Sequence, residues 1–179
     1  REYPRAVRFA DIGAGSGCIA VTVAHQAPYS LGYAVDLSAE AIRVAQRNAV
    51  RHRVAERLLF VRSSLMDCFP QAPCLDFILC NPPYVALDEC DSLPVEVRDH
   101  EPHDALFGGA SGLDGFRGLI PEVPARLRDG GWLLLEIGAG QALQVGRLVE
   151  NAGLDLQGML DDLQGIPRCV VARKTSRET

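Results

Sequence analysis

Short runs of apolar residues alternate along the chain with longer segments in which apolar residues recur every three or four positions. The short runs are typical of strands buried on both faces of a sheet, and they span residues 7–12, 31–35, 58–61, 75–80, 132–137 and 167–173. The longer patterns predict helices over residues 18–25, 39–52, 115–128 and 141–152. Because such an alternation needs right-handed crossovers, the pattern predicts an α/β fold with a mostly parallel sheet and helices on both faces.

The predicted helix over residues 39–52 has the clearest two-sided pattern. Ser38 precedes it and belongs to the residue types that cap helix N-termini. The helical period places three small or apolar residues inward, Ile42, Ala45 and Ala49, and three polar ones outward, Arg43, Gln46 and Arg47. We therefore expect this helix to pack on the sheet along one face.

One stretch breaks the alternation. Residues 84–114 contain glycines and prolines but no clear period, directly after one of the apolar runs. A long irregular loop inside a compact domain is usually functional or disordered. We expect this stretch to act as a lid or a substrate-binding loop.

The composition is that of an ordinary soluble globular protein, which we expect to be cytoplasmic. With 179 residues, the chain suits a single domain with its own core. The net charge of −5 offers no general attraction for nucleic-acid phosphates or anionic lipid, and no apolar run approaches the length of a membrane span. The cysteines and histidines lack the short spacings of a zinc site, so we expect no metal; the cysteines stand at positions 18, 68, 74, 80, 90 and 169.

A glycine-rich loop follows the first predicted strand. Residues 11–17 form the pattern D-x-G-x-G-x-G, in which the third glycine comes one residue too early for a dinucleotide fingerprint. Asp36 ends the second predicted strand, where its carboxylate can accept hydrogen bonds from both hydroxyls of a ribose. The two features predict a cradle for a nucleoside without a diphosphate, and S-adenosylmethionine meets that description.

A second motif, Asn81-Pro82-Pro83-Tyr84, follows the fourth apolar run. Consecutive prolines hold this turn extended and stiff, so the Asn81 side-chain oxygen and the Pro82 carbonyl can be aimed at one point. These two oxygens can take both hydrogens of a planar NH2 group while Tyr84 packs on its face. The lone pair of the nitrogen would then point at an electrophilic methyl group.

Together these motifs resemble the catalytic domain of the bacterial peptide-chain release factor glutamine N5-methyltransferases. The resemblance runs over nearly the whole chain and is carried by residues 11–20, 81–85, 101–109, 112–115 and 130–138, with Gln141. It implies the class I S-adenosylmethionine-dependent methyltransferase fold, with a seven-stranded sheet. It also implies transfer of a methyl group to the glutamine side chain in the Gly-Gly-Gln loop of a release factor.

The resemblance assigns residues to both ligands. Catalysis and substrate binding fall to Asn81, Pro82 and Tyr84, with Pro83 in the same turn. Cofactor binding falls to Asp11, Gly13, Ala14, Gly15, Ser16, Gly17, Asp36, Leu37, Ser64, Leu65 and Asn81. Two features depart from the family: Ser63 to Met66 stand where an acidic residue is usual near the adenine, and the family's helical N-terminal domain has no counterpart in these residues.

Two other functions remain open at this stage. An amino-methyltransferase acting on a nucleic-acid base would use the same tetrapeptide, because adenine and guanine also carry planar NH2 groups. Such enzymes need basic surfaces, whereas residues 88–104 hold seven carboxylates and one arginine. The other possibility is a protein that binds S-adenosylmethionine without catalysis, against which the complete tetrapeptide argues.

Overall fold

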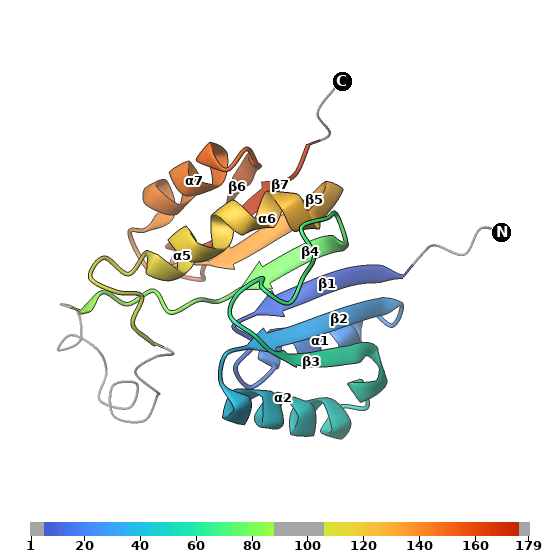
Figure 1. Ribbon diagram of the computed structural model, residues 1–179. Coiled ribbons are helices and arrows are strands. Elements are labelled where there is room, and N and C mark those ends of the chain that lie inside the picture. The colour runs from blue at the N-terminus through green and yellow to red at the C-terminus, as the bar shows by residue number, and fades with distance from the viewer. Residues whose placement is uncertain (1–5, 88–105, 176–179) are drawn as a thin grey trace.

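The computed structural model describes residues 6–87 and 106–175, which form a sheet with helices on both faces (Figure 1). The strands run in the order β3-β2-β1-β4-β5-β7-β6. The first five in this order are parallel, whereas β7 lies antiparallel between β5 and β6. Their bounds are β1 Val7–Ile12, β2 Ser30–Asp36, β3 Leu58–Arg62, β4 Leu75–Cys80, β5 Leu127–Glu136, β6 Asp155–Asp161 and β7 Pro167–Arg173. The predicted, mostly parallel α/β sheet is confirmed.

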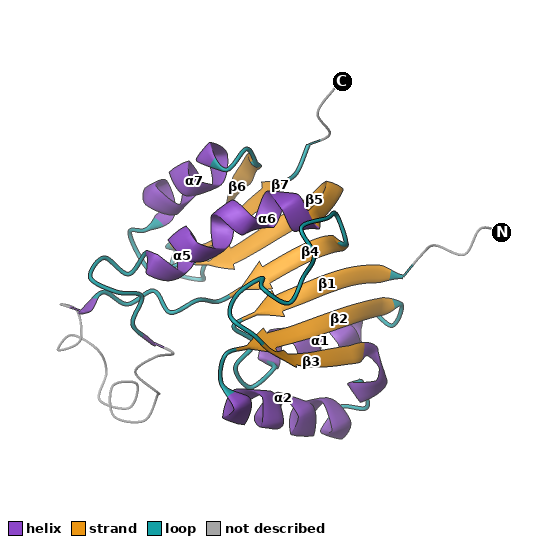
Figure 2. Cartoon of the chain, viewed as in Figure 1, coloured by secondary structure: helices purple, strands orange, loops and turns teal. Residues whose placement is uncertain are grey.

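The helices divide between the two faces (Figure 2). On one face, α5 (Asp114–Leu119), α6 (Val123–Arg126) and α7 (Ala142–Asn151) enclose the larger apolar core. On the other, α1 (Cys18–Gln26) and α2 (Ala39–Arg51) enclose a smaller one over β1, β2 and β3. The expected pattern of α2 is confirmed: Ser38 Oγ accepts a hydrogen bond from Ala41 N at 3.2 Å, and Ile42, Ala45 and Ala49 are buried.

Two elements differ from the sequence prediction. The single helix expected over residues 115–128 is broken into α5, a 3-10 turn (Ile120–Glu122) and α6. Pro121 and Pro124 explain the break, because proline cannot donate the backbone hydrogen bond that a continuing helix needs. The strand β6 was not predicted, since it is an edge strand in which only Leu156 and Met159 are half-buried apolar residues that pack against the core.

The ends of the irregular stretch 84–114 are more ordered than its sequence suggests. Val85 and Phe107 form an isolated parallel bridge, with Val85 N donating to the Leu106 carbonyl at 3.0 Å and Gly108 N to the Val85 carbonyl at 2.9 Å. The seven carboxylates noted in residues 88–104 lie outside the described residues. The two arms of the stretch, residues 84–87 and 106–114, are therefore fastened side by side at the edge of the fold.

The face of the sheet that carries α1 and α2 is partly open over β4 and β5. An apolar hollow of about 430 Å³ there is lined by residues of β1, β4 and β5 and of the turn before β2. Trp132, the only tryptophan of the chain, is half-buried in β5, with the Arg173 guanidinium 5.3 Å from its ring. In the parts of the chain that the structure describes, no helix is long and apolar enough to cross a membrane.

Candidate active site

The predicted motifs meet where the strand order changes direction. β1 and β4 are neighbours in the sheet, although two strands separate them in the sequence. The connection after β1 leads to β2 on one side, and the chain after β4 continues to β5 on the other. In open α/β sheets such a switch point leaves a crevice at the carboxyl ends of the strands, where ligands bind. The glycine loop follows β1 and the tetrapeptide follows β4, so both border this crevice.

The glycine loop adopts a conformation that requires glycine. Gly13, Gly15 and Gly17 have φ values of 73°, 55° and 78°, which residues with a Cβ rarely adopt. A Cβ on Gly15 would meet no atom within 4 Å, whereas one on Gly17 would stand 2.9 Å from Ala45 Cβ in α2. Gly17 thus allows helix packing, and Gly15 leaves open space beside the backbone for a ligand. The loop is held from behind, since Asn48 Nδ2 donates to the Ser16 carbonyl at 2.9 Å.

Asp36 lies across this loop at the end of β2. Its Oδ2 accepts a hydrogen bond from Gly15 N, and its Oδ1 accepts one from Ser38 N, both at 2.8 Å. Because each carboxylate oxygen can accept more than one hydrogen bond, the group keeps capacity for two hydroxyl donors. Leu37 beside it is 67% exposed, an apolar surface next to the carboxylate. The neighbourhood of Asp36 thus combines hydroxyl acceptors with a flat apolar contact.

Asp11 is buried beneath the glycine loop. Its Oδ2 accepts from Ala20 N at 2.9 Å, while its Oδ1 is buried without a hydrogen-bond partner in the described part of the chain. Burial raises the pKa of Asp11 from 3.8 to about 7, and the nearby charge of Asp36 acts in the same direction. An unsatisfied carboxylate oxygen below a ligand crevice is suited to a cation that enters from above.

The residues predicted after β3 differ in where their side chains lie. Ser64 is exposed, whereas Leu65 packs partly against the larger core. Leu65 has a φ of 40°, and its Cδ1 lies 2.9 Å from where a Cβ on Gly118 of α5 would stand. A non-glycine residue in this conformation is held by its surroundings and marks a constrained turn at the sheet edge. The Leu65 side chain therefore contacts α5.

The tetrapeptide follows β4 beside the glycine loop. Its Asn81 is exposed, and the Asn81 carbonyl oxygen lies 3.9 Å from where a Cβ on Gly13 would stand. Pro82 is buried against Gly115, and Tyr84 is half-buried. The stiff turn therefore presents the Asn81 amide to solvent directly beside the glycine loop.

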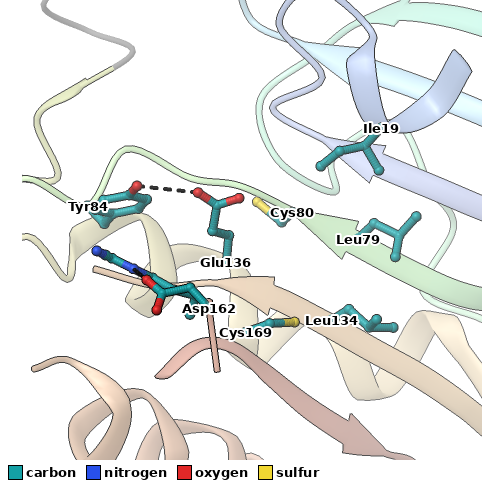
Figure 3. Close-up of a pocket in the computed structure, with 9 residues that line it drawn as sticks. Ile19, Leu79, Cys80, Tyr84, Leu134, Glu136, Asp162 and Cys169 are labelled. Carbon is teal, nitrogen blue, oxygen red and sulfur yellow. Dashed lines mark hydrogen bonds and ion pairs between the residues drawn. The ribbon is translucent and has the colours of Figure 1, made fainter. Parts of the chain in front are cut away.

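A cavity of about 610 Å³ borders Tyr84 at the end of this turn (Figure 3). The Tyr84 hydroxyl donates to Glu136 Oε1 of β5 at 3.3 Å, and the Asp162–Arg168 ion pair, at 3.1 Å, also lines the cavity. The remaining lining residues are Ile19, Leu79, Cys80, Leu134 and Cys169. The resemblance included Glu136 without assigning it a role. The sequence shows Glu136 as a carboxylate at the end of an otherwise apolar strand, but this pattern does not predict its contact with Tyr84.

Three comparisons with known proteins bear on the site. A family model described as "Methyltransferase small domain" matches residues 2–94. A release factor glutamine methyltransferase of Cereibacter sphaeroides is 48% identical over 163 residues, 91% of this chain and 58% of that protein. One of Geobacter sulfurreducens is 40% identical over 173 residues, 97% of this chain and 60% of that protein. The resemblance seen in the sequence is confirmed, and the chain spans less than two thirds of the length of these curated relatives.

Among solved structures, a methyltransferase from Pyrococcus furiosus superposes with a TM-score of 0.71. The match covers 97% of this chain and 78% of that one, at 17% sequence identity. A likeness at this identity shows the fold, and together with the strand order it confirms the class I methyltransferase fold.

Proposed function

The chain belongs to the methyltransferase small domain family, and we propose that it transfers a methyl group from S-adenosylmethionine to a release factor. The acceptor is the side-chain amide nitrogen (N5) of the glutamine in the Gly-Gly-Gln loop. The observation that carries this proposal is the 48% identity to a release factor glutamine methyltransferase over 91% of the chain. Because the chain spans 58% of that relative, the activity of the whole protein is part of the proposal.

The residues around the crevice fit S-adenosylmethionine, which carries a ribose, an adenine and positive charge. Asp36 offers acceptors for the ribose hydroxyls, and Leu37 offers an apolar surface for the adenine. Gly15 leaves room for close approach, and the Asp11 carboxyl below the loop, with its unpartnered Oδ1, supplies negative charge in its ionised form. When bound, the cofactor supplies a methyl group made electrophilic by its sulfonium. The proposal assigns the remaining cofactor contacts predicted from the sequence to Gly13, Ala14, Ser16, Gly17, Ser64, Leu65 and Asn81.

The tetrapeptide acts on the amide of the substrate. An amide nitrogen is a poor nucleophile because its lone pair is delocalised into the carbonyl. With its two hydrogens accepted by the Asn81 side-chain oxygen and the Pro82 carbonyl, the nitrogen is held with its lone pair toward the crevice. The same oxygens stabilise the positive charge that develops on nitrogen as the new bond forms, and the methylated nitrogen, made acidic by this charge, then loses one proton to water. Tyr84, fixed by Glu136, borders the cavity from which the substrate side chain would enter.

The proposal is tested by incubating the protein with methyl-labelled S-adenosylmethionine and a release factor domain that carries Gly-Gly-Gln. We expect label on the glutamine, located by mass spectrometry, and none on a release factor variant with Asn in place of that glutamine. Labelling of duplex DNA or ribosomal RNA in place of the release factor would overturn the assignment. It would favour an amino-methyltransferase acting on a base.

The role of Asn81 has its own test. Asn81→Ala should lower turnover by about a hundredfold, since it removes one of the two oxygens that orient the nucleophile. Asn151→Ala is a matched control, because Asn151 is exposed at the end of α7. Calorimetry should show that cofactor affinity falls far less than turnover in Asn81→Ala. Near-normal turnover in this variant would exclude the mechanism.

A further inference from the structure

Both ends of the last tetrapeptide residue, Tyr84, are held by polar side chains from distant parts of the chain. The Tyr84 hydroxyl donates to Glu136, as described above. The Tyr84 carbonyl accepts a hydrogen bond at 2.9 Å from Nε2 of Gln141, 57 residues away in the sequence. The side chain and the backbone of this residue are thus fixed from β5 and from the residue that precedes α7.

The side-chain amide of Gln141 forms hydrogen bonds with three segments of the chain. Its Nε2 also donates to the Gly112 carbonyl at 3.3 Å, and its Oε1 accepts from Gly138 N at 2.9 Å. Two carbonyls face the amide nitrogen and one N–H faces the amide oxygen, so only one orientation of the amide satisfies all three. Gln141 therefore joins the tetrapeptide, the second arm of the 84–114 stretch and the turn after β5.

The glycines around this amide provide the space that it needs. A Cβ on Gly112 would stand 2.7 Å from Gln141 Nε2, and one on Gly138 would stand 3.0 Å from Gln141 Oε1 and 3.1 Å from Tyr84 Cδ2. Gly112 also has a φ of 67°, which favours glycine. The backbone at both positions is therefore shaped around the contact between Gln141 and Tyr84.

We propose that Gln141 is a positioning residue for the tetrapeptide. It fixes the Tyr84 carbonyl, and through the two stiff prolines before Tyr84 it sets the direction of the Asn81 amide toward the substrate nitrogen. The role rests on the proposed function and goes beyond it, because it names a residue that touches neither cofactor nor substrate. A small displacement of an orienting group costs turnover steeply, whereas ground-state binding of the cofactor at the glycine loop is unaffected.

The test compares Gln141→Ala and Gln141→Glu with Gln144→Ala, whose residue is exposed three positions later in α7. At a temperature where all variants are folded, both Gln141 variants should lose about ten- to a hundredfold in kcat. Their affinity for S-adenosylhomocysteine, measured by calorimetry, should stay within about twofold. A glutamate accepts from Gly138 N but cannot donate to two carbonyls while ionised, so the kcat of Gln141→Glu should partly recover as the pH is lowered. Wild-type kcat in both Gln141 variants would overturn the proposal.

A second measurement tests the positioning without catalysis. Tyr84 O belongs to the peptide group of Val85 N, so loss of the hydrogen bond from Gln141 should shift the Val85 amide resonance in a ¹⁵N–¹H spectrum. If Gln141 positions the tetrapeptide, the Asn81 side-chain amide resonance should shift as well. Neither the Val85 nor the Asn81 resonance should move in Gln144→Ala. An unchanged Asn81 resonance would refute the positioning role. Failure to label any release factor with the wild-type chain would instead refute the proposed function.

Discussion

Replacing Asp11 by asparagine should make the stability of the protein depend less on pH. The Asp11 carboxyl is 1% exposed, and burial raises its pKa from 3.8 to about 7. Asparagine has nearly the same shape, and its side-chain oxygen can still accept the hydrogen bond from Ala20 N. The substitution therefore removes the ionisation of this group and keeps its one described hydrogen bond.

The direction of the pH dependence follows from the protonation of Asp11 in the folded and the unfolded chain. Between pH 4 and 7 the unfolded chain has lost the Asp11 proton while the folded chain still holds it, so the free energy of unfolding falls as the pH rises. Below this window both states are protonated, and above it both are ionised. The shift from 3.8 to about 7 corresponds to about 4 kcal/mol, at about 1.36 kcal/mol for each pKa unit. The free energy of unfolding of Asp11→Asn, taken relative to that of the wild type, should therefore rise by about 4 kcal/mol from pH 4 to pH 8.

Urea unfolding followed by the fluorescence of Trp132 measures this difference under reducing conditions. The exposed Asp155→Asn is the control and should show no comparable rise with pH. If the free energy difference between Asp11→Asn and the wild type is the same at pH 4 and pH 8, the burial argument is refuted.

Cofactor binding should favour the ionised form of Asp11, which burial disfavours in the free protein. A bound cation beside Asp11 favours the ionised form, so binding below pH 7 should release a proton. The affinity for S-adenosylmethionine should then rise with pH up to about 7, by at most tenfold for each unit, and level off above it. Calorimetry in two buffers of different ionisation enthalpy detects the proton release, which Asp11→Asn should abolish.

Four further predictions concern the crevice and α2. Asp36→Asn should lower cofactor affinity tenfold to a hundredfold in calorimetry, because it removes a charged acceptor that contributes about 1.5–3 kcal/mol. Gly17→Ala should destabilise the fold by about 1–3 kcal/mol in urea unfolding, since its Cβ would meet Ala45 at a φ of 78°. Gly15→Ala has open space at its Cβ, so it should reduce cofactor binding more than stability. Ser38→Ala should cost about 1 kcal/mol of stability, measured in the same way, through loss of the N-cap bond.

The sequence predicted those parts of the site that depend on local backbone geometry. The glycine loop and the tetrapeptide carry their own conformational limits, and parallel strands bring their ends to one edge of the sheet. Asp36 was predicted for the same reason, because it ends the strand beside the loop. Asp11 was assigned only by resemblance. The sequence did not predict that its Oδ1 is buried without a hydrogen-bond partner among the described residues.

What the sequence did not predict depends on contacts between distant residues. Glu136 and Gln141 reach Tyr84 across 52 and 57 residues, and no local pattern records such a pairing. The edge strand β6 was missed because only one of its faces meets the core, so its apolar residues are sparse. The break between α5 and α6 was signalled by Pro121 and Pro124, but the apolar period of the segment favoured a single helix.

The bridge between Val85 and Phe107 makes the segment between them an exchangeable cassette. Its two ends are fastened to the fold. The entropic cost of closing a loop, expressed as a free energy, rises by only about 0.6 kcal/mol when the loop length doubles. The segment can therefore change in length or charge at little cost to the stability of the sheet. Chimeras that exchange residues 88–105 between methyltransferases of this fold should keep folding and cofactor binding while their choice of acceptor changes.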